Sequence, residues 1–435
     1  MAKIVFIGAG SLVFSQRLMI DILSFPALRD SQFELVDIDS KRLDYAKEIA
    51  ERIVKEGNFP TKIHVTMDRK EALKGADYVV IMILVGGIDV ISKDINIPLK
   101  YGVDQCIGDT LGPGGVFRAL RTIPVIVDIC KDIEKLCPEA LVINYTNPMA
   151  MLCWAMEKVT NVKYVGLCHS VQGTAMELAN YIGAPYEEVS YWVAGINHQA
   201  WFLEFKWNGK DAYPLLRKRI TNLQLYNKDT TRFEMLKHLG YFVTESSGHN
   251  SEYSPWFRKR KDLLKKYTSG GGWNGGTGYI LQLYGKDREH YEEEIERVAS
   301  GKEAINLKRS GEYGSYIINA METGEIVRIN GNVCNRGLIT NLPEGCCVEV
   351  PCYVDKHGIN PCFVGDLPPQ LAALNKMNIS VQEMAVKAAL TKDKEMAYYA
   401  IAYDPLTAAV LSLGEIKDMV NEMFEAEKTV LPQFK

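Results

Sequence analysis

Short apolar runs alternate with segments of helical periodicity through the first half of the chain. Five of these runs have the length of a buried strand: residues 4–7, 33–37, 78–84, 141–145 and 164–168. Strands that are apolar on both faces are typical of parallel sheets, in which helices cover each side. The pattern therefore predicts an α/β fold with a Rossmann-like, doubly wound and mostly parallel sheet.

Helical periodicity fills the connections between the runs. Apolar side chains recur every three or four positions over 43–53, behind a helix start at Asp39 or Ser40. Further helices are predicted near residues 116–136, 149–159 and 172–182. This alternation of strands and helices is the pattern expected of βαβ units.

The second half of the chain has a different pattern. A strand is predicted at 191–196, and aromatic-rich strands, long loops and helices follow it. The last two helices are expected near 380–400 and 406–428. Mixed elements of this kind are typical of an α+β region. We therefore predict an α/β domain at 1–195 and an α+β domain at 196–435.

The composition is that of an ordinary globular protein, with 47% hydrophobic and 24% charged residues. A net charge of −4 and the lack of a lysine-arginine block argue against nucleic acid or an anionic membrane as a partner. No apolar run reaches the ~18 residues of a spanning helix. Ten scattered cysteines without a CxxC pair indicate reduced, buried thiols. Because the chain also enters a strand at once, without a signal peptide, a cytoplasmic protein is expected.

A glycine turn, Gly8-Ala9-Gly10, lies between the first predicted strand and its helix. Such a turn lets backbone amides approach a pyrophosphate at a helix N-terminus. Asp37 ends the second strand, where a carboxylate can accept hydrogen bonds from the adenosine ribose and would repel a 2′-phosphate. A third glycine is lacking, and a tight turn that binds nothing is the alternative. The arrangement favours an NAD site.

Polar residues follow three apolar strands at their ends. Asn147 comes after the run at 141–145, Cys168 and His169 end the next run, and His198 follows the third. Carboxyl ends of parallel strands face one crevice, so these side chains are expected to converge. A thiolate and an imidazole are good ligands for a divalent transition metal. The alternative is a buried free cysteine beside a partly exposed histidine.

Two glycine-rich segments leave alternatives open. Residues 108–115 precede a helix and could cradle an anion, bind sugar hydroxyls or simply turn the chain. Residues 269–279 are interpreted as an exposed linker without a role, and a lid over the site is the alternative.

The motifs also resemble those of glycoside hydrolase family 4, the NAD- and divalent-metal-dependent glycosidases, over essentially the whole chain. The segments that carry the resemblance are 8–11, 36–39, 108–115, 144–148, 166–171 and 195–198. The Cys-His-Ser-Val form of 168–171 and the segments 241–257 and 341–350 resemble the α-galactosidase (melibiase) branch.

The resemblance implies a mechanism that differs from the usual two-carboxylate scheme. NAD⁺ takes hydride from C3 of the sugar, a base removes the acidified C2 proton, and the aglycone leaves C1. Water then adds to C1, and the retained NADH reduces C3 again. A divalent metal, expected to be Mn²⁺, binds the C2 and C3 oxygens. The implied protein is a homodimer or homotetramer with a fold like the lactate and malate dehydrogenases, and it cleaves unphosphorylated α-galactosides such as melibiose.

Site residues follow from the same resemblance. Cys168 and His198 match the family's metal ligands, and Asp109 and Asn147 match substrate-binding positions. His169 is expected to bind substrate and to act as the general acid for the leaving group. The residues expected to bind the cofactor are Gly8, Gly10, Ser11, Asp37 and Asn147.

The base that removes the C2 proton is open between three residues. Tyr253 is preferred, with His249 and Glu252 behind it, although Tyr253 could instead be an aromatic core residue. A phenol with a pKa near 10 needs a nearby metal to act as a base. Glu245 and Glu252 could be imagined as a conventional acid and nucleophile pair. Glu245 is interpreted instead as a solvated loop carboxylate.

Other functions remain open. Within the family, α-glucosidase or α-galacturonidase activity is the nearest alternative. An NAD-dependent hydroxyacid or sugar dehydrogenase is a second one, but its paired Asp and His and its arginines cannot be placed in the chain. A non-enzymatic NAD sensor is a third, and it would not need Cys168 and His198 to converge.

Overall fold

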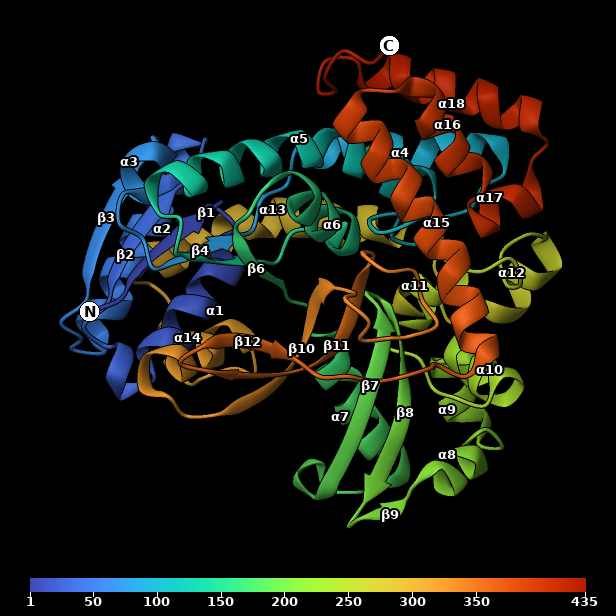
Figure 1. Cartoon of the computed structure of the whole chain (residues 1–435), viewed down its shortest axis with the longest axis horizontal. Coiled ribbons are helices and arrows are strands. Elements are labelled where there is room, and N and C mark those ends of the chain that lie inside the picture. The colour runs from blue at the N-terminus through green and yellow to red at the C-terminus, as the bar shows by residue number, and fades with distance from the viewer.

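The computed structural model describes the backbone of residues 1–435 and all side chains except those of residues 12, 13, 286–292 and 294. Two sets of strands join edge to edge into one twelve-stranded sheet. Figure 1 shows the first set at the left and the second set in the lower centre of the molecule. The site described below lies where the two sets meet.

The first set consists of six parallel strands. They are β1 (Lys3–Ile7), β2 (Gln32–Val36), β3 (Lys62–Thr66), β4 (Tyr78–Ile81), β5 (Leu141–Asn144) and β6 (Lys163–Gly166). Their order is β3-β2-β1-β4-β5-β6, so the direction of winding reverses between β1 and β4. Ligands of such sheets bind beyond the carboxyl ends of the strands near that reversal.

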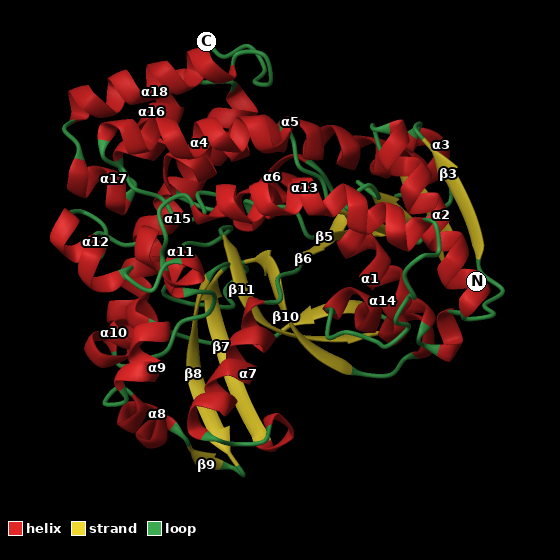
Figure 2. Ribbon diagram, turned by 180° about the vertical axis from the view of Figure 1, so that it is seen from behind, coloured by secondary structure: helices red, strands yellow, loops and turns green.

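Helices cover both faces of the parallel set. The helices of this part of the chain are α1 (Leu12–Leu23), α2 (Ser40–Glu56), α3 (Arg69–Leu73), α4 (Gly87–Tyr101), α5 (Gly112–Leu136), α6 (Met149–Val159) and α7 (Ser170–Ile182), of which α7 packs on the second set of strands. Figures 1 and 2 show α5 along one side of the sheet and α1 on the other. Because helices exclude water from each face, β1, β4 and β5 are buried almost throughout, which explains their continuous apolar runs. The predicted α/β class is confirmed.

The second set is antiparallel. Its strands are β7 (Val189–Ile196), β8 (Gln199–Trp207), β9 (Lys210–Asp211), β10 (Val327–Cys334), β11 (Cys347–Asp355) and β12 (Gly358–Pro361). Asn332 of β10 pairs with Gly166 of β6, and this contact joins the two sets. Glu349 of β11 pairs with Gly195 of β7. The division at residue 195 therefore falls inside a strand, and it stays a prediction.

The remaining helices belong to the second half of the chain, and several of them pack on helices of the first half. They are α8 (Tyr213–Arg219), α9 (Leu223–Lys228), α10 (Thr230–Leu239), α11 (Ser247–Glu252), α12 (Lys261–Tyr267), α13 (Tyr279–Ala299), α14 (Tyr313–Thr323), α15 (Pro369–Thr391), α16 (Lys394–Ala402), α17 (Pro405–Val410) and α18 (Leu413–Glu427). Figure 1 shows α16 and α18 stacked against α4. Within the described part of the chain, no helix combines the length and the apolar character needed to cross a membrane.

A buried ion-pair group fixes α18 to the first half. Arg121 of α5 contacts Asp94 of α4 at 2.5 Å and Glu427, the last residue of α18, at 3.1 Å. All three side chains are buried. Burial and Asp94 raise the pKa of Glu427 to about 9, so Arg121 and Asp94 form the charged pair, and Glu427 accepts a hydrogen bond from Arg121 that ties α18 to α5.

Candidate active site

A cleft of about 1310 Å³ runs past the carboxyl ends of the parallel strands. Every site residue expected from the sequence lines it, with the exception of two candidate bases, Tyr253 and Glu252. The lining residues among them are Gly8, Gly10, Ser11, Asp37, Asp109, Asn147, Cys168, His169 and His198. The topology therefore brings together residues that lie up to 190 positions apart in the chain.

The glycine turn after β1 forms one part of the cleft wall. Gly8 has a φ of 89°, and a Cβ atom on it would lie 2.5 Å from the carbonyl oxygen of Met82. Only glycine fits this position. The Gly10 N–H donates to Oδ2 of Asp37 at 2.7 Å, which holds the carboxylate at the rim of the turn. Close backbone approach and a strand-end acid suit the pyrophosphate and ribose of a dinucleotide.

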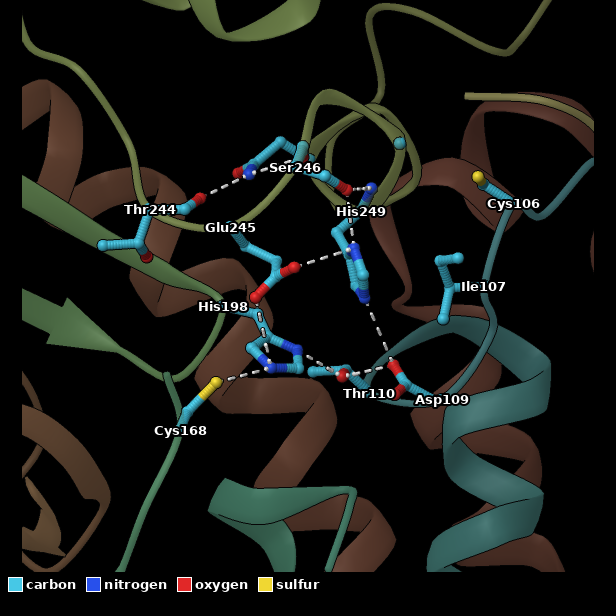
Figure 3. Close-up of polar contacts among 12 residues, drawn as sticks. Cys106, Ile107, Asp109, Thr110, Cys168, His198, Thr244, Glu245, Ser246 and His249 are labelled. Atoms are coloured by element: carbon cyan, nitrogen blue, oxygen red, sulfur yellow. Dashed lines mark hydrogen bonds and ion pairs between the residues drawn. The ribbon is translucent and has the colours of Figure 1, made fainter. Parts of the chain in front are cut away.

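Three potential metal ligands converge in the same cleft, as Figure 3 shows. Sγ of Cys168 lies 3.3 Å from Nε2 of His198, and Oε2 of Glu245 lies 3.7 Å from the same nitrogen. The three ligand atoms lie within 4.8 Å of one another. A sulfur, a nitrogen and an oxygen donor together suit a divalent transition metal.

Thr110 determines which nitrogen of His198 faces this group. The Thr110 hydroxyl donates to Oδ1 of Asp109 at 2.7 Å, because a carboxylate can only accept. Thr110 has no second proton, so its oxygen accepts from Nδ1–H of His198 at 2.8 Å. Nε2 then carries the lone pair, which points toward Cys168 and Glu245. Burial also lowers the pKa of His198 and favours the neutral imidazole that binds metals.

Three acidic groups, Cys168, Glu245 and Glu349, influence one another at this site. Burial raises the pKa of the Cys168 thiol well above its usual value, and Glu245 and Glu349 raise it further. Burial and Glu245 raise the pKa of Glu349 to about 8. A bound cation would offset this repulsion and favour the thiolate. The donor set and the local charge therefore fit a divalent metal.

Asp109 and His249 also line the cleft, next to the three potential metal ligands. Nε2 of His249 lies 3.8 Å from Oδ1 of Asp109, and Nδ2 of Asn147 donates to Oδ2 of Asp109 at 2.9 Å. Burial alone would raise the pKa of Asp109, but His249, His198 and Arg118 lower it to about 2. Asp109 is thus a carboxylate that can accept hydrogen bonds from a ligand in the cleft.

The three candidate bases occupy different positions. His249 lines the cleft, and its Nδ1 lies 2.8 Å from Oγ of Ser246 and 3.4 Å from Oε1 of Glu245. Tyr253 lies behind His249, with 6.0 Å between the ring centroids, and is fully buried. Burial raises the pKa of the Tyr253 hydroxyl well above 10, and Asp109 raises it further.

Glu252 acts on the backbone of a neighbouring loop. Its carboxylate accepts N–H groups from Cys106 at 2.6 Å, Ile107 at 3.2 Å and Gly108 at 3.0 Å. Charge-assisted bonds of this kind are strong and fix the loop that leads to Asp109. The hydrogen bond from Gly108 gives the segment 108–115 one role, which is to hold Asp109 in the wall of the cleft.

His169 lies at the mouth of the cleft. It stands at the N-cap position of α7 without a capping hydrogen bond from its side chain, which is 69% exposed. Its Nδ1 lies 3.8 Å from Oε1 of Glu312, a buried carboxylate. The ring is therefore accessible to a leaving group and to water at the same time.

The interpretation of Glu245 as a solvated loop carboxylate is wrong. Its side chain is largely buried, with a relative exposure of 17%, and lies between His198 and His249. Both Glu245 and His198 have a positive φ, of 67° and 63°, a conformation that non-glycine residues rarely adopt. The sequence gives no sign of these backbone angles. The spacing of four positions between Glu245 and His249 is the feature of the sequence that could have suggested a contact between the two side chains.

Comparison with known proteins identifies relatives over the whole chain. Residues 3–184 match the model for family 4 glycosyl hydrolases, and residues 193–407 match the model for the C-terminal domain of that family. An α-galactosidase of Bacillus subtilis is 44% identical over 100% of both chains. An α-galactosidase of Rhizobium meliloti is 41% identical over 99% of this chain and 89% of its own length. An α-galacturonidase of Lachnoclostridium phytofermentans is 32% identical over 99% and 97%.

Solved structures share the fold. A putative glucosidase of Bacillus subtilis superposes with a TM-score of 0.88 at 28% identity, over 97% of this chain and 99% of its own. A 6-phospho-α-glucosidase from gut microorganisms, solved with NAD and Mn²⁺, gives 0.83 at 19% identity over 99% of both chains. Malate dehydrogenase of Plasmodium falciparum gives 0.54 at 13% identity over 90% of this chain and 99% of its own. The expected likeness to malate dehydrogenase is confirmed.

Proposed function

Since the chain belongs to the family 4 glycosyl hydrolases, we propose that it is an α-galactosidase that cleaves unphosphorylated α-galactosides such as melibiose. The single observation that carries this proposal is the identity of 44% and 41% to two α-galactosidases over essentially the full chain. Activity on α-glucosides or α-galacturonides is the alternative within the family, since relatives with those names match less closely.

The cofactors of the proposed reaction are NAD and a divalent metal, with Mn²⁺ as the first choice. Bound NAD would supply a hydride acceptor and donor for the sugar, and the metal a Lewis acid for its hydroxyl oxygens. Gly8, Gly10 and Ser11 would face the pyrophosphate, and Asp37 the ribose. Asn147 would contact both the cofactor and the sugar.

Cys168 and His198 would hold the metal, and Glu245 is a third candidate ligand. Oε2 of Glu245 lies 3.7 Å from Nε2 of His198, so it is close enough to bind the same metal ion as the other two donor atoms. The lone pair on that nitrogen, fixed by Thr110, supports the assignment. Two or three protein ligands leave positions open for substrate oxygens, as a Lewis-acid site requires.

The remaining residues would orient the sugar and move protons. Asp109 would accept hydrogen bonds from sugar hydroxyls, and His169 would protonate the departing oxygen. His249 is the best placed of the three candidate bases for the C2 proton because it lines the cleft. Tyr253 and Glu252 remain the alternatives. A general base must reach the proton that it removes, which is why position is weighed before pKa.

The partner in this proposal is a small α-galactoside, and no nucleic acid or membrane is required. We also propose a homodimer or homotetramer in the cytoplasm. The ten cysteines are all free in the structure, which is consistent with a reducing compartment.

Hydrolysis of p-nitrophenyl α-galactoside by the reduced enzyme tests the proposal. NAD⁺ and Mn²⁺ are added and omitted independently, with the α-glucoside and α-galacturonide in parallel. We expect release of nitrophenol only with both additives, fastest with the galactoside and without net NADH. Accumulation of NADH with a hydroxy acid or a free sugar, and no cleavage of any glycoside, would identify a dehydrogenase instead.

A further inference from the structure

The glycine-rich segment 269–279 is tied to the body of the protein. Nδ2 of Asn274 donates to the carbonyl oxygen of Asn227 at 2.8 Å. The hydroxyl of Thr277 donates to Oδ2 of Asp104 at 2.6 Å. Side-chain bonds to two distant parts of the chain hold the segment in one position, which a free linker does not need.

This segment places one tryptophan in the wall of the cleft. Trp273 lies in a short 3₁₀ turn, and its indole stacks on His249 with 5.9 Å between ring centroids and 8° between planes. The rings of Trp273 and Tyr279 form a T-shaped pair with 5.2 Å between their centroids. His249 is only 4% exposed, whereas Trp273 keeps 49% of its surface exposed. The ring is thus fixed by its neighbours and still offers much of its surface to the cleft.

The surroundings of Trp273 differ from those of the metal group. Ile107, Ile280 and Tyr284 line the same cleft, and together with Trp273 we call them the aromatic wall. His249 separates this wall from His198, with 5.1 Å between the two imidazole centroids. The polar and apolar parts of the cleft are therefore adjacent, and His249 contacts both.

A pyranose ring presents apolar C–H faces that pack well on an aromatic plane, while its hydroxyls remain hydrated. We propose that the aromatic wall binds the sugar ring of the aglycone, and that the Trp273 indole is the surface on which this ring stacks. The inference rests on the proposed function, because it takes the galactosyl ring to lie at the metal group. The second ring of a disaccharide, attached at C1, then extends past His249 toward Trp273.

The kinetic test compares two substrates with the same galactosyl group. Melibiose carries a sugar aglycone, and α-galactosyl fluoride carries none. We expect Trp273→Ala to lower kcat/KM for melibiose about tenfold more than for the fluoride, with Trp273→Phe between wild type and Trp273→Ala, because one aromatic contact accounts for about one factor of ten. Trp256→Ala is the matched control, since Trp256 is 41% exposed, packs on Phe257 and is not part of the cleft wall.

A binding measurement makes the result independent of turnover. Tryptophan emission of the protein with Mn²⁺ but without NAD⁺, which prevents turnover, is titrated with melibiose in wild type, Trp273→Phe and Trp256→Phe. We expect a change that is lost in Trp273→Phe and kept in Trp256→Phe. No change in wild type, a change that survives in Trp273→Phe, or an equal loss of kcat/KM with both substrates overturns the inference. If wild type cleaves neither galactoside, the proposed function fails, and the emission titration decides the inference by itself.

Discussion

Thr110 controls the chemistry of His198 without being one of the potential metal ligands itself. Its hydroxyl oxygen lies 2.8 Å from Nδ1 of His198, and its only O–H group donates a hydrogen bond to Asp109. The opposite nitrogen of the ring is therefore free to bind a metal between Cys168 and Glu245. Partners of this kind orient the ligand and fix its tautomer.

The first prediction concerns this bond. Thr110→Val keeps the shape of the side chain and removes the oxygen, so His198 loses the acceptor that fixes its tautomer. We expect Mn²⁺ affinity to fall about 10- to 100-fold, as for other second-sphere partners of metal-binding histidines. Electron paramagnetic resonance titration of free Mn²⁺ measures the affinity. Thr110→Ser restores the oxygen and should bind nearly as wild type, and equal affinity in the Val and wild-type proteins would refute the tautomer argument.

Glu245 offers a test of the third ligand position. Glu245→Gln removes the negative charge beside Cys168 and His198 with little change of shape. Mn²⁺ affinity should fall by about a factor of ten or more, because the cation loses one anionic donor. NAD⁺ affinity, measured by calorimetry, serves as the control for folding. If Mn²⁺ affinity stays the same and only turnover falls, Glu245 acts on His249 and not on the metal.

The base is tested by two variants in parallel. His249→Gln should lower kcat about 10²- to 10⁴-fold, the usual contribution of a general base, and abolish exchange of the C2 hydrogen with deuterium from solvent. Tyr253→Phe should keep both within severalfold of wild type, because the Tyr253 side chain is fully buried and lies outside the cleft wall. The opposite pattern, with exchange lost only in Tyr253→Phe, would return the role to the tyrosine.

Glu349 predicts a pH dependence of stability in the metal-free protein. Burial and Glu245 raise its pKa to about 8 in the folded state, from about 4.5 in the unfolded chain. As the pH rises, the unfolded chain therefore releases this proton first, and the contribution of Glu349 to stability falls between about pH 4.5 and about pH 8. The Glu349→Gln variant has no carboxyl group at this position, so it should not lose stability in this way. In EDTA, denaturant unfolding should show wild type losing about 2 kcal/mol or more relative to the variant between pH 5 and pH 8. A constant difference across that range would contradict the assignment.

Much of the parallel sheet could be predicted from the sequence because it is buried on both faces. The runs at 4–7, 78–84 and 141–145 coincide with β1, β4 and β5 to within a few residues. β3 was missed, since it lies at the sheet edge and its side chains are mostly half buried or exposed. An edge strand needs no continuous apolar run.

The C-terminal helices show where periodicity fails. The predicted helix near 380–400 spans a break, because α15 ends at Thr391 and Lys392 takes a left-handed conformation with a φ of 56°. Neither glycine nor proline marks this position in the sequence. The packing of α15 on α16 and α5 fixes the turn, and a pattern of apolar residues carries no record of it.

The candidate site was predictable where it depends on strand ends and less so elsewhere. Cys168 and His198 follow apolar strands, so the topology of the sheet brings them together. Glu245 and Trp273 come from loops whose position depends on long-range bonds, such as those of Asn274 and Thr277. A single sequence contains no periodic signal for such bonds.

The contact between Arg121 and Glu427 has a consequence for the order of synthesis. The six parallel strands are complete at residue 166. The carboxyl group of Glu427, which contacts Arg121 of α5, belongs to a residue made more than two hundred positions later. Until α18 emerges from the ribosome, Arg121 has its charged partner Asp94 but lacks the hydrogen bond that it donates to Glu427. A fragment that contains all six parallel strands but not α18 therefore leaves one N–H group of the buried Arg121 without its partner, so the interior of the first half is completed only by the last helix of the chain.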